Sequence, residues 1–169
     1  RIKVRIKFKI LTSYKIIYYL LFIFLVLFFI SPPLYAQTFS IMSYNIRYDN
    51  TWDKENSWIL RKNEVKQVFL KYAPSIIGVQ EGLFNQVEYI DSCLIDYDYI
   101  GVGRDDGKEQ GEFCPIYFDT TRYTLEKNST FWLSENPDTV SIGWDAALER
   151  ICTYGLFKDR KTKEHLWVF

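Results

Sequence analysis

A four-residue apolar run, Ile76-Ile77-Gly78-Val79, constrains the fold more than any other part of the sequence. It is too short for a helix and has no polar face, which is typical of a strand that is buried on both sides. Residues 58–72 precede the run and residues 83–94 follow it, and both segments have apolar side chains at spacings of three and four. A buried strand between two amphipathic helices requires layers of helix against sheet.

The rest of the sequence adds short strand-like runs that are separated by polar turns. Besides the run at Ile76, we expect strands over Phe39–Arg47, Tyr97–Val102, Phe113–Phe118, Tyr123–Glu126, Thr130–Leu133, Arg150–Phe157 and His165–Phe169. Residues 158–164 are polar and predict a hairpin turn between the last two strands. The sequence therefore predicts an α/β (α+β) fold, in which a layered β-sandwich is flanked by helices.

The net charge of zero is the sum of two parts with opposite charge. Of the 21 Lys+Arg and 21 Asp+Glu in the 169 residues, the first 36 residues hold six basic and no acidic ones. The six are Arg1, Lys3, Arg5, Lys7, Lys9 and Lys15. The remaining 133 residues therefore hold 15 basic and 21 acidic ones. An acidic body disfavours a long nucleic acid as substrate, because contacts to its phosphates come from clustered Lys and Arg.

The basic start is followed by the uncharged apolar run Ile16–Ile30, then by Ser31-Pro32-Pro33 and the small residue Ala36. This order is typical of a secretory signal peptide. We expect residues 1–36 to be a signal peptide and residues 37–169 to be an exported body, periplasmic or extracellular. The run is shorter than the roughly 20 residues of a membrane-spanning helix. A membrane anchor over residues 14–30 is the alternative.

Histidine and cysteine are scarce. The single histidine, His165, excludes a histidine-rich metal site, and a Ser-His-Asp triad would depend on it alone. Cys93, Cys114 and Cys152 have no CxxC spacing, so they predict neither a zinc site nor a redox motif. Buried free thiols are the favoured interpretation, and one disulfide is the alternative, because export permits it.

Two strand ends carry polar residues. Asn45 lies at the end of the first expected strand, and Glu81 follows the run at Ile76. In layered α/β folds, ligands collect beyond the carboxyl ends of strands. Amide and carboxylate oxygens suit Mg²⁺ or Mn²⁺. An Asx turn at Asn45 and a helix cap at Glu81 explain the two residues equally well.

The segments Ser43–Tyr48 and Pro74–Gly82, with the intervening helix, resemble the opening of the endonuclease/exonuclease/phosphatase superfamily. This superfamily contains metal-dependent phosphoesterases with the pancreatic-deoxyribonuclease-like fold. Five further segments resemble one branch of exported bacterial members: Tyr99–Gly107, Gly111–Glu112, Pro115–Phe118, Thr130–Ser134 and Gly143–Ala147. The resemblance covers most of residues 39–169.

The resemblance implies roles for four residues. Glu81 would be a metal ligand, and Asn45 would hold the metal site or the phosphate. Glu112 matches a position that orients a catalytic histidine in relatives, and the nearby Asp105, Asp106 and Glu109 are readily explained as plain solvated charges. Arg150 matches a position that contacts phosphate.

A plain surface role explains Arg150 equally well. The guanidinium would then form a surface ion pair with Glu149 or Asp145, which lie close by in the sequence.

The later motifs of the superfamily, an Asn-Thr-His strand end, Gly-Asp-x-Asn and Ser-Asp-His, do not occur in this sequence. His165 begins the last expected strand instead of ending it, so we interpret it as a surface residue of a hairpin. Because these motifs are missing, the sequence is expected to be an N-terminal fragment of a phosphoesterase. General acid–base groups contribute about 10²- to 10⁴-fold to a rate, so the fragment is expected to have little or no activity by itself.

For the complete protein, the resemblance implies hydrolysis of a phosphodiester or phosphomonoester by metal-activated water. A small molecule or a lipid head group is favoured over nucleic acid, and a monomer is expected. A secreted nuclease is one alternative. Another is an exported, non-catalytic domain whose tryptophans stack on a sugar or a lipid head group. The tryptophans are Trp52, Trp58, Trp132, Trp144 and Trp167.

Overall fold

The computed structural model describes residues 14–26 and 39–169, which form two separate units. Residues 14–26 are an exposed helix within the first unit. Among the residues that the structure describes, no helix combines the length and the apolar character needed to cross a bilayer. The rest of the leader expected at residues 1–36 lies outside the described residues. The leader's role as signal peptide or anchor stays a prediction.

The second unit begins with a four-stranded sheet in the order β1-β2-β4-β3. Its elements are β1 (Ile41–Asn45), α2 (Trp58–Tyr72), β2 (Ile76–Gln80), α3 (Phe84–Cys93), β3 (Tyr97–Ile100) and β4 (Ile116–Asp119), with a 3₁₀ helix η1 (Thr51–Asn56) before α2. β1 and β2 are parallel, and β4 runs antiparallel to both β2 and β3. The predicted strand between two helices is therefore confirmed.

A second, antiparallel sheet consists of β5 (Tyr123–Trp132), β6 (Ile151–Asp159) and β7 (His165–Val168). The expectation of two separate strands at Tyr123–Glu126 and Thr130–Leu133 was wrong, because β5 continues through both. The polar residues between them are exposed and stay paired with β6, with one register shift between Leu125 and Lys127. Polar side chains are compatible with a strand that has one face in water.

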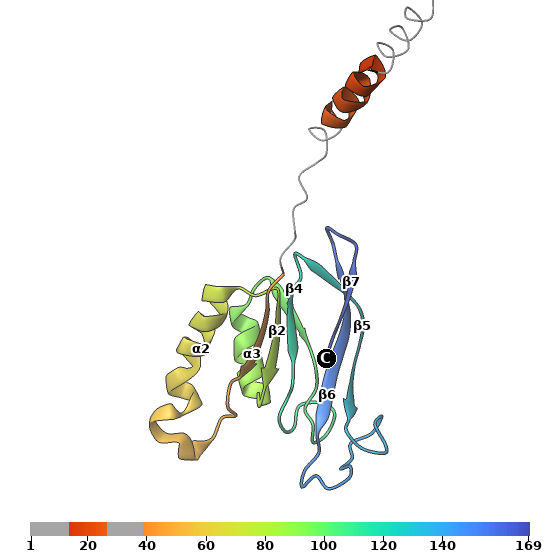
Figure 1. The fold of residues 1–169 in the computed structure, drawn as a ribbon. Coiled ribbons are helices and arrows are strands. Elements are labelled where there is room, and N and C mark those ends of the chain that lie inside the picture. The colour runs from red at the N-terminus through yellow and green to blue at the C-terminus, as the bar shows by residue number, and fades with distance from the viewer. Residues whose placement is uncertain (1–13, 27–38) are drawn as a thin grey trace, which may run out of the picture. The chain divides into compact units, whose positions relative to one another are not determined.

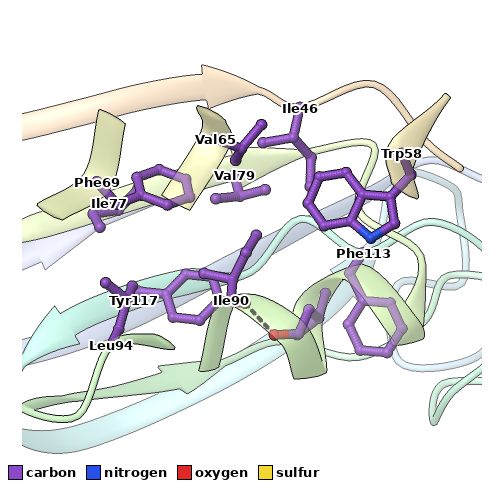
Figure 2. Close-up of a cluster of buried hydrophobic side chains, with 11 residues drawn as sticks. Ile46, Trp58, Val65, Phe69, Ile77, Val79, Ile90, Leu94, Phe113 and Tyr117 are labelled. Atoms are coloured by element: carbon purple, nitrogen blue, oxygen red, sulfur yellow. Dashed lines mark hydrogen bonds between the residues drawn. The ribbon is translucent and has the colours of Figure 1, made fainter. Parts of the chain in front are cut away.

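The two sheets and the helices form layers (Figure 1). α2 and α3 cover one face of the first sheet, and the second sheet lies against its other face. One core cluster lies between the helices and the first sheet and includes Phe69, Ile77 and Tyr117 (Figure 2). The other joins the two sheets through residues such as Ile116 and Phe157. The predicted layered β-sandwich with flanking helices is confirmed.

Asp159 stabilises the turn between β6 and β7 through hydrogen bonds and an ion pair. Its Oδ1 accepts hydrogen bonds from the backbone N–H groups of Lys161 at 2.8 Å and Thr162 at 3.0 Å. Its Oδ2 lies 3.1 Å from Nε of Arg122. The N–H of Thr162, and then Lys161 and Arg122, hold the pKa of this carboxyl below its usual value, against the opposing effect of burial.

These contacts predict an acid-sensitive hairpin. A lowered folded-state pKa means that the stabilisation is complete above the unfolded pKa of about 3.9 and is lost as the pH falls below it. Asp159→Asn should therefore destabilise the protein at pH 7 and reduce the stability that is lost between pH 6 and pH 3. Urea unfolding across this range tests both effects. Identical pH profiles for the two proteins would contradict the prediction.

Candidate functional site

Asn45 and Glu81 meet at one edge of the first sheet. Because β1 and β2 are parallel, their carboxyl ends lie side by side, with Asn45 paired to Gln80 in the ladder. The Nδ2 of Asn45 donates a hydrogen bond to Oε1 of Glu81 at 2.8 Å. The Oδ1 of Asn45 accepts from the N–H of Arg47 at 2.9 Å, which is an Asx turn. The Asx turn and the pairing with Glu81 therefore coexist.

The second oxygen of Glu81, Oε2, is buried and has no hydrogen-bond partner among the described residues. An unpaired buried carboxylate oxygen is costly, because it has lost its hydration without compensation. Glu81 also has a left-handed backbone conformation, with φ of 60°. Strain of this kind is concentrated at binding and catalytic sites. Glu81 does not cap α3, because the N-cap of that helix is Leu83.

These features fit a hard divalent cation at Glu81. A carboxylate whose Oε2 is buried and has no partner among the described residues supplies a negative charge and a ligand of the type that Mg²⁺ and Mn²⁺ prefer. In the observed arrangement, Asn45 turns its Nδ2 toward the carboxylate and so orients it. Direct ligation by Asn45 stays a prediction. Within the described part of the chain, no three His, Cys, Asp or Glu side chains form a group that could hold a metal ion.

Two side chains that the sequence analysis did not single out, the half-buried Arg61 and the buried Gln86, hold the loop after β1. Arg61 on α2 donates to the carbonyl of Ile46 and, at 2.6 Å, to the carbonyl of Arg47. Gln86 on α3 is fully buried and donates from Nε2 to the same carbonyl of Arg47 at 3.0 Å. A signal was present in the sequence, since Gln86 lies directly beside Val87 on the apolar face of its helix.

Glu112 lies next to the strand end that carries Glu81. Its neighbour Phe113 pairs with Gly82, and the N–H of Phe113 donates to the carbonyl of Gly82 at 2.7 Å. The Oε2 of Glu112 is 3.0 Å from Nη1 of Arg104, whose side chain is only 13% exposed. Glu112 is therefore part of a half-buried ion pair and not a freely solvated charge. Arg104 was not identified as the partner of Glu112 from the sequence alone.

Arg150 lies immediately before β6 and is exposed. Its carbonyl accepts from the N–H of Leu133 at 2.7 Å. Among the described residues, its guanidinium forms no ion pair, so the expected alternative partners Glu149 and Asp145 are not used.

Arg150 belongs to the same end of the molecule as the other three candidates. Trp132, one residue before Leu133, donates from Nε1 to the carbonyl of Arg104 at 2.8 Å, which ties the start of β6 to the loop of Glu112. The loops 101–115 and 133–150 lie at the lower end of the view, where β2 also ends (Figure 1).

The remaining sequence candidates lie elsewhere or are inert. His165 is exposed on β7, where its Nε2 is 3.0 Å from Oε2 of Glu126, so the interpretation as a surface hairpin residue is confirmed. All three cysteines are free and half-buried. Burial raises the pKa of the Cys114 and Cys152 thiols, which disfavours the reactive thiolate.

The five tryptophans do not form one surface. Trp58 and Trp132 are core residues, at 4% and 6% exposure. Trp52 and Trp144 are 85% and 72% exposed, and Trp167 is half-exposed on the second sheet. Two of the five therefore pack in the interior, and only Trp52, Trp144 and Trp167 are exposed enough to stack on a ligand.

Comparison with solved structures yields close matches. An endonuclease/exonuclease/phosphatase from Bacteroides vulgatus is 42% identical, with a TM-score of 0.72 over 76% of this chain and 49% of that chain. A mannosyl-6-phosphatase from Bacteroides thetaiotaomicron is 39% identical, with a TM-score of 0.74 over 77% and 49% of the two chains. The chain thus spans about half the length of these proteins. No protein-family model and no curated protein sequence matches it.

More distant structures share the fold alone. The catalytic domain of human Nocturnin, solved with a bound sulfate anion, is 14% identical and has a TM-score of 0.60 over 76% of this chain and 47% of that chain.

Proposed function

Because the chain belongs to the endonuclease/exonuclease/phosphatase superfamily, we propose that the complete protein hydrolyses a phosphate ester with the aid of Mg²⁺ or Mn²⁺. The observation that carries this proposal is Oε2 of Glu81, which is buried at the edge where β1 and β2 end and has no partner within residues 14–26 and 39–169. Hard carboxylate oxygens of this kind are the ligands that bind these ions.

The residues of this chain would divide the work as follows. Glu81 would hold the ion, and Asn45 orients the carboxylate through its bond to Oε1. A bound ion of this type stabilises charge on the phosphate and makes a bound water more acidic. Arg150 is free to offer two parallel donors to phosphate oxygens. Glu112, fixed by Arg104, would orient a catalytic imidazole, as the resemblance to the superfamily implies.

A small or lipid-head-group phosphoester is our favoured substrate class, and nucleic acid is the alternative. Two observations support this choice. The residues after position 36 carry an excess of acidic over basic side chains, which weakens binding to a polyanion. One relative of 39% identity is a mannosyl-6-phosphatase.

A panel of a sugar phosphate, a glycerophosphodiester and duplex DNA separates the substrate classes, and preferential cleavage of DNA would favour the secreted nuclease. The leader pattern supports export of the body.

Metal dependence gives the most direct test of the proposal. Dialysis of the complete protein against EDTA should abolish hydrolysis, and added Mg²⁺ or Mn²⁺ should restore it, because the ion contributes several kcal/mol of transition-state stabilisation. Hydrolysis that is unchanged after verified metal removal would overturn the proposal.

Exposed aromatic rings favour a second candidate function, non-catalytic binding of a sugar. Trp52 and Trp144 present open ring faces, which suit stacking on a sugar. A non-catalytic sugar-binding domain would lose ligand affinity in Trp52→Ala and Trp144→Ala and would show no turnover of any phosphoester.

A further inference from the structure

We propose that Gln86 is a positioning residue that links the loop after β1 to the loop after β2 and thereby holds Asn45 against Glu81. The inference rests on the proposed function, because it concerns the same metal-binding pair. It is carried by the contacts of one fully buried amide side chain.

Gln86 contacts both loops at once. Its Oε1 accepts hydrogen bonds from the N–H of Asp49 at 2.8 Å and from the N–H of Leu83 at 3.0 Å. Its Nε2 donates to the carbonyl of Arg47 at 3.0 Å. Asp49 and Arg47 follow β1, and Leu83 lies two residues after Glu81. One side chain therefore satisfies three backbone groups from two separate strand ends.

The link reaches Asn45 through a single residue. The N–H of Arg47 donates to Oδ1 of Asn45, while the carbonyl of Arg47 accepts from Gln86. Arg47 has a φ of 61°, so it stays in this turn only while its surroundings hold it there. Arg61 also donates to this carbonyl, but its hydrogen bonds go to the carbonyls of residues 46, 47 and 56, all of which precede the second loop.

Burial makes this link consequential. Gln86 is 0% exposed, so an apolar replacement leaves the half-buried N–H groups of Asp49 and Leu83 without this partner, while the carbonyl of Arg47 keeps only its bond from Arg61. The two N–H groups then need new partners, which favours movement of both loops. We therefore expect loss of the amide to separate the two loops and to release Asn45 from Glu81.

Two matched pairs of variants in the complete protein test the inference. Gln86→Met removes the amide at similar volume, and Ile90→Ala, one turn further along α3 in the same core, controls for lost core packing. Leu83→Pro removes the leucine side chain together with the N–H that donates to Gln86, and Leu83→Ala removes the side chain but keeps the N–H.

Proline is compatible with the backbone at position 83. Leu83 has φ of −79° and ψ of 160°, within the range that the proline ring adopts. The preceding residue, Gly82, is paired with Phe113 in a β-bridge, an extended arrangement that proline tolerates before it. The pair at position 83 decides the question even where Gln86→Met does not fold.

Three measurements apply to each pair: the melting temperature, the NMR resonances of the Asn45 side-chain amide without metal, and the Mn²⁺ dissociation constant. We expect Gln86→Met and Leu83→Pro to shift the amide resonances toward solvent-exposed values. We also expect them to weaken Mn²⁺ binding at least about tenfold, as is usual when a residue behind a metal ligand is lost. Ile90→Ala and Leu83→Ala should leave the Asn45 amide resonances at their wild-type positions, whatever the melting temperatures of these variants. Their Mn²⁺ dissociation constants should stay within about twofold of wild type.

Unchanged Asn45 resonances and unchanged Mn²⁺ binding in Gln86→Met and Leu83→Pro would overturn the inference and leave Gln86 as a core residue. Failure of the proposed function has a different signature. The wild-type protein would then bind no Mn²⁺ and hydrolyse no phosphoester, while the Asn45 resonances would still report whether Gln86 positions that side chain.

Discussion

Glu81→Gln is expected to lower kcat of the complete protein by about a thousandfold. A metal ion contributes several kcal/mol to stabilising a phosphoryl transition state, and each 1.36 kcal/mol is a factor of ten in rate. The amide has the shape of the carboxylate but neither its charge nor its second oxygen. The Nδ2 of Asn45 can still donate to the oxygen of the glutamine amide, so the fold should persist while the ion is lost.

The matched control is Glu109→Gln, which makes the same chemical change at an exposed position in the loop before Glu112. Its kcat should stay within about twofold of wild type, since surface substitutions of this kind rarely matter. Steady-state kinetics at saturating Mg²⁺, with circular dichroism as a check on folding, measures both variants. Full activity of a folded Glu81→Gln protein would rule out Glu81 as the metal ligand.

Phe157→Ala is expected to lower the free energy of unfolding by about 3–5 kcal/mol. The side chain is 0% exposed and packs between the two sheets, with ring centroids 5.0 Å from Phe118 and 6.5 Å from Tyr123. Its removal leaves a cavity where the second sheet contacts the first. Because small domains have a total stability of only about 5–15 kcal/mol, the loss is a large share of the total.

Phe131→Ala provides the control on the same sheet. Phe131 lies on β5, is partly exposed, and contacts Tyr154 at a centroid distance of 6.0 Å. Its loss should cost clearly less than the loss of Phe157, because the Phe131 ring is already partly in water and an aromatic pair contributes only about 0.5–1.5 kcal/mol beyond the area it buries. Urea unfolding followed by tryptophan fluorescence compares the two variants. Equal destabilisation would mean that the contact between the sheets is not the principal support of the second sheet.

Local patterns were sufficient for most of the secondary structure. The helix expected at 58–72 occupies those residues, and the buried run at Ile76 is a strand, because apolar spacing and a following Pro74 are properties of adjacent residues. The division of β5 into two strands failed for the converse reason. Residues 127–129 are polar and exposed, and only their pairing with β6, far along the chain, keeps them extended.

The candidate site was predictable where strand ends carried it. Asn45 and Glu81 could be named because parallel strands end at the same edge, and the resemblance to a family supplied Glu112 and Arg150. Gln86 and Arg104 could not be named, because a polar residue on an apolar face and a charge in a polar loop have many interpretations. Their roles depend on which backbone groups folding brings within hydrogen-bond distance.

By itself, the sequence determined the alternation of helix and strand, the layered fold class and the two polar strand ends, because all three depend on residues close together in the chain. The tertiary structure alone decided that Nδ2 of Asn45 reaches Oε1 of Glu81 and that Oε2 is buried with no partner in the described part of the chain. The physical reason is distance along the chain. Asn45 and Glu81 are 36 residues apart, and only the parallel pairing of β1 and β2, held from behind by α2 and α3, brings them together.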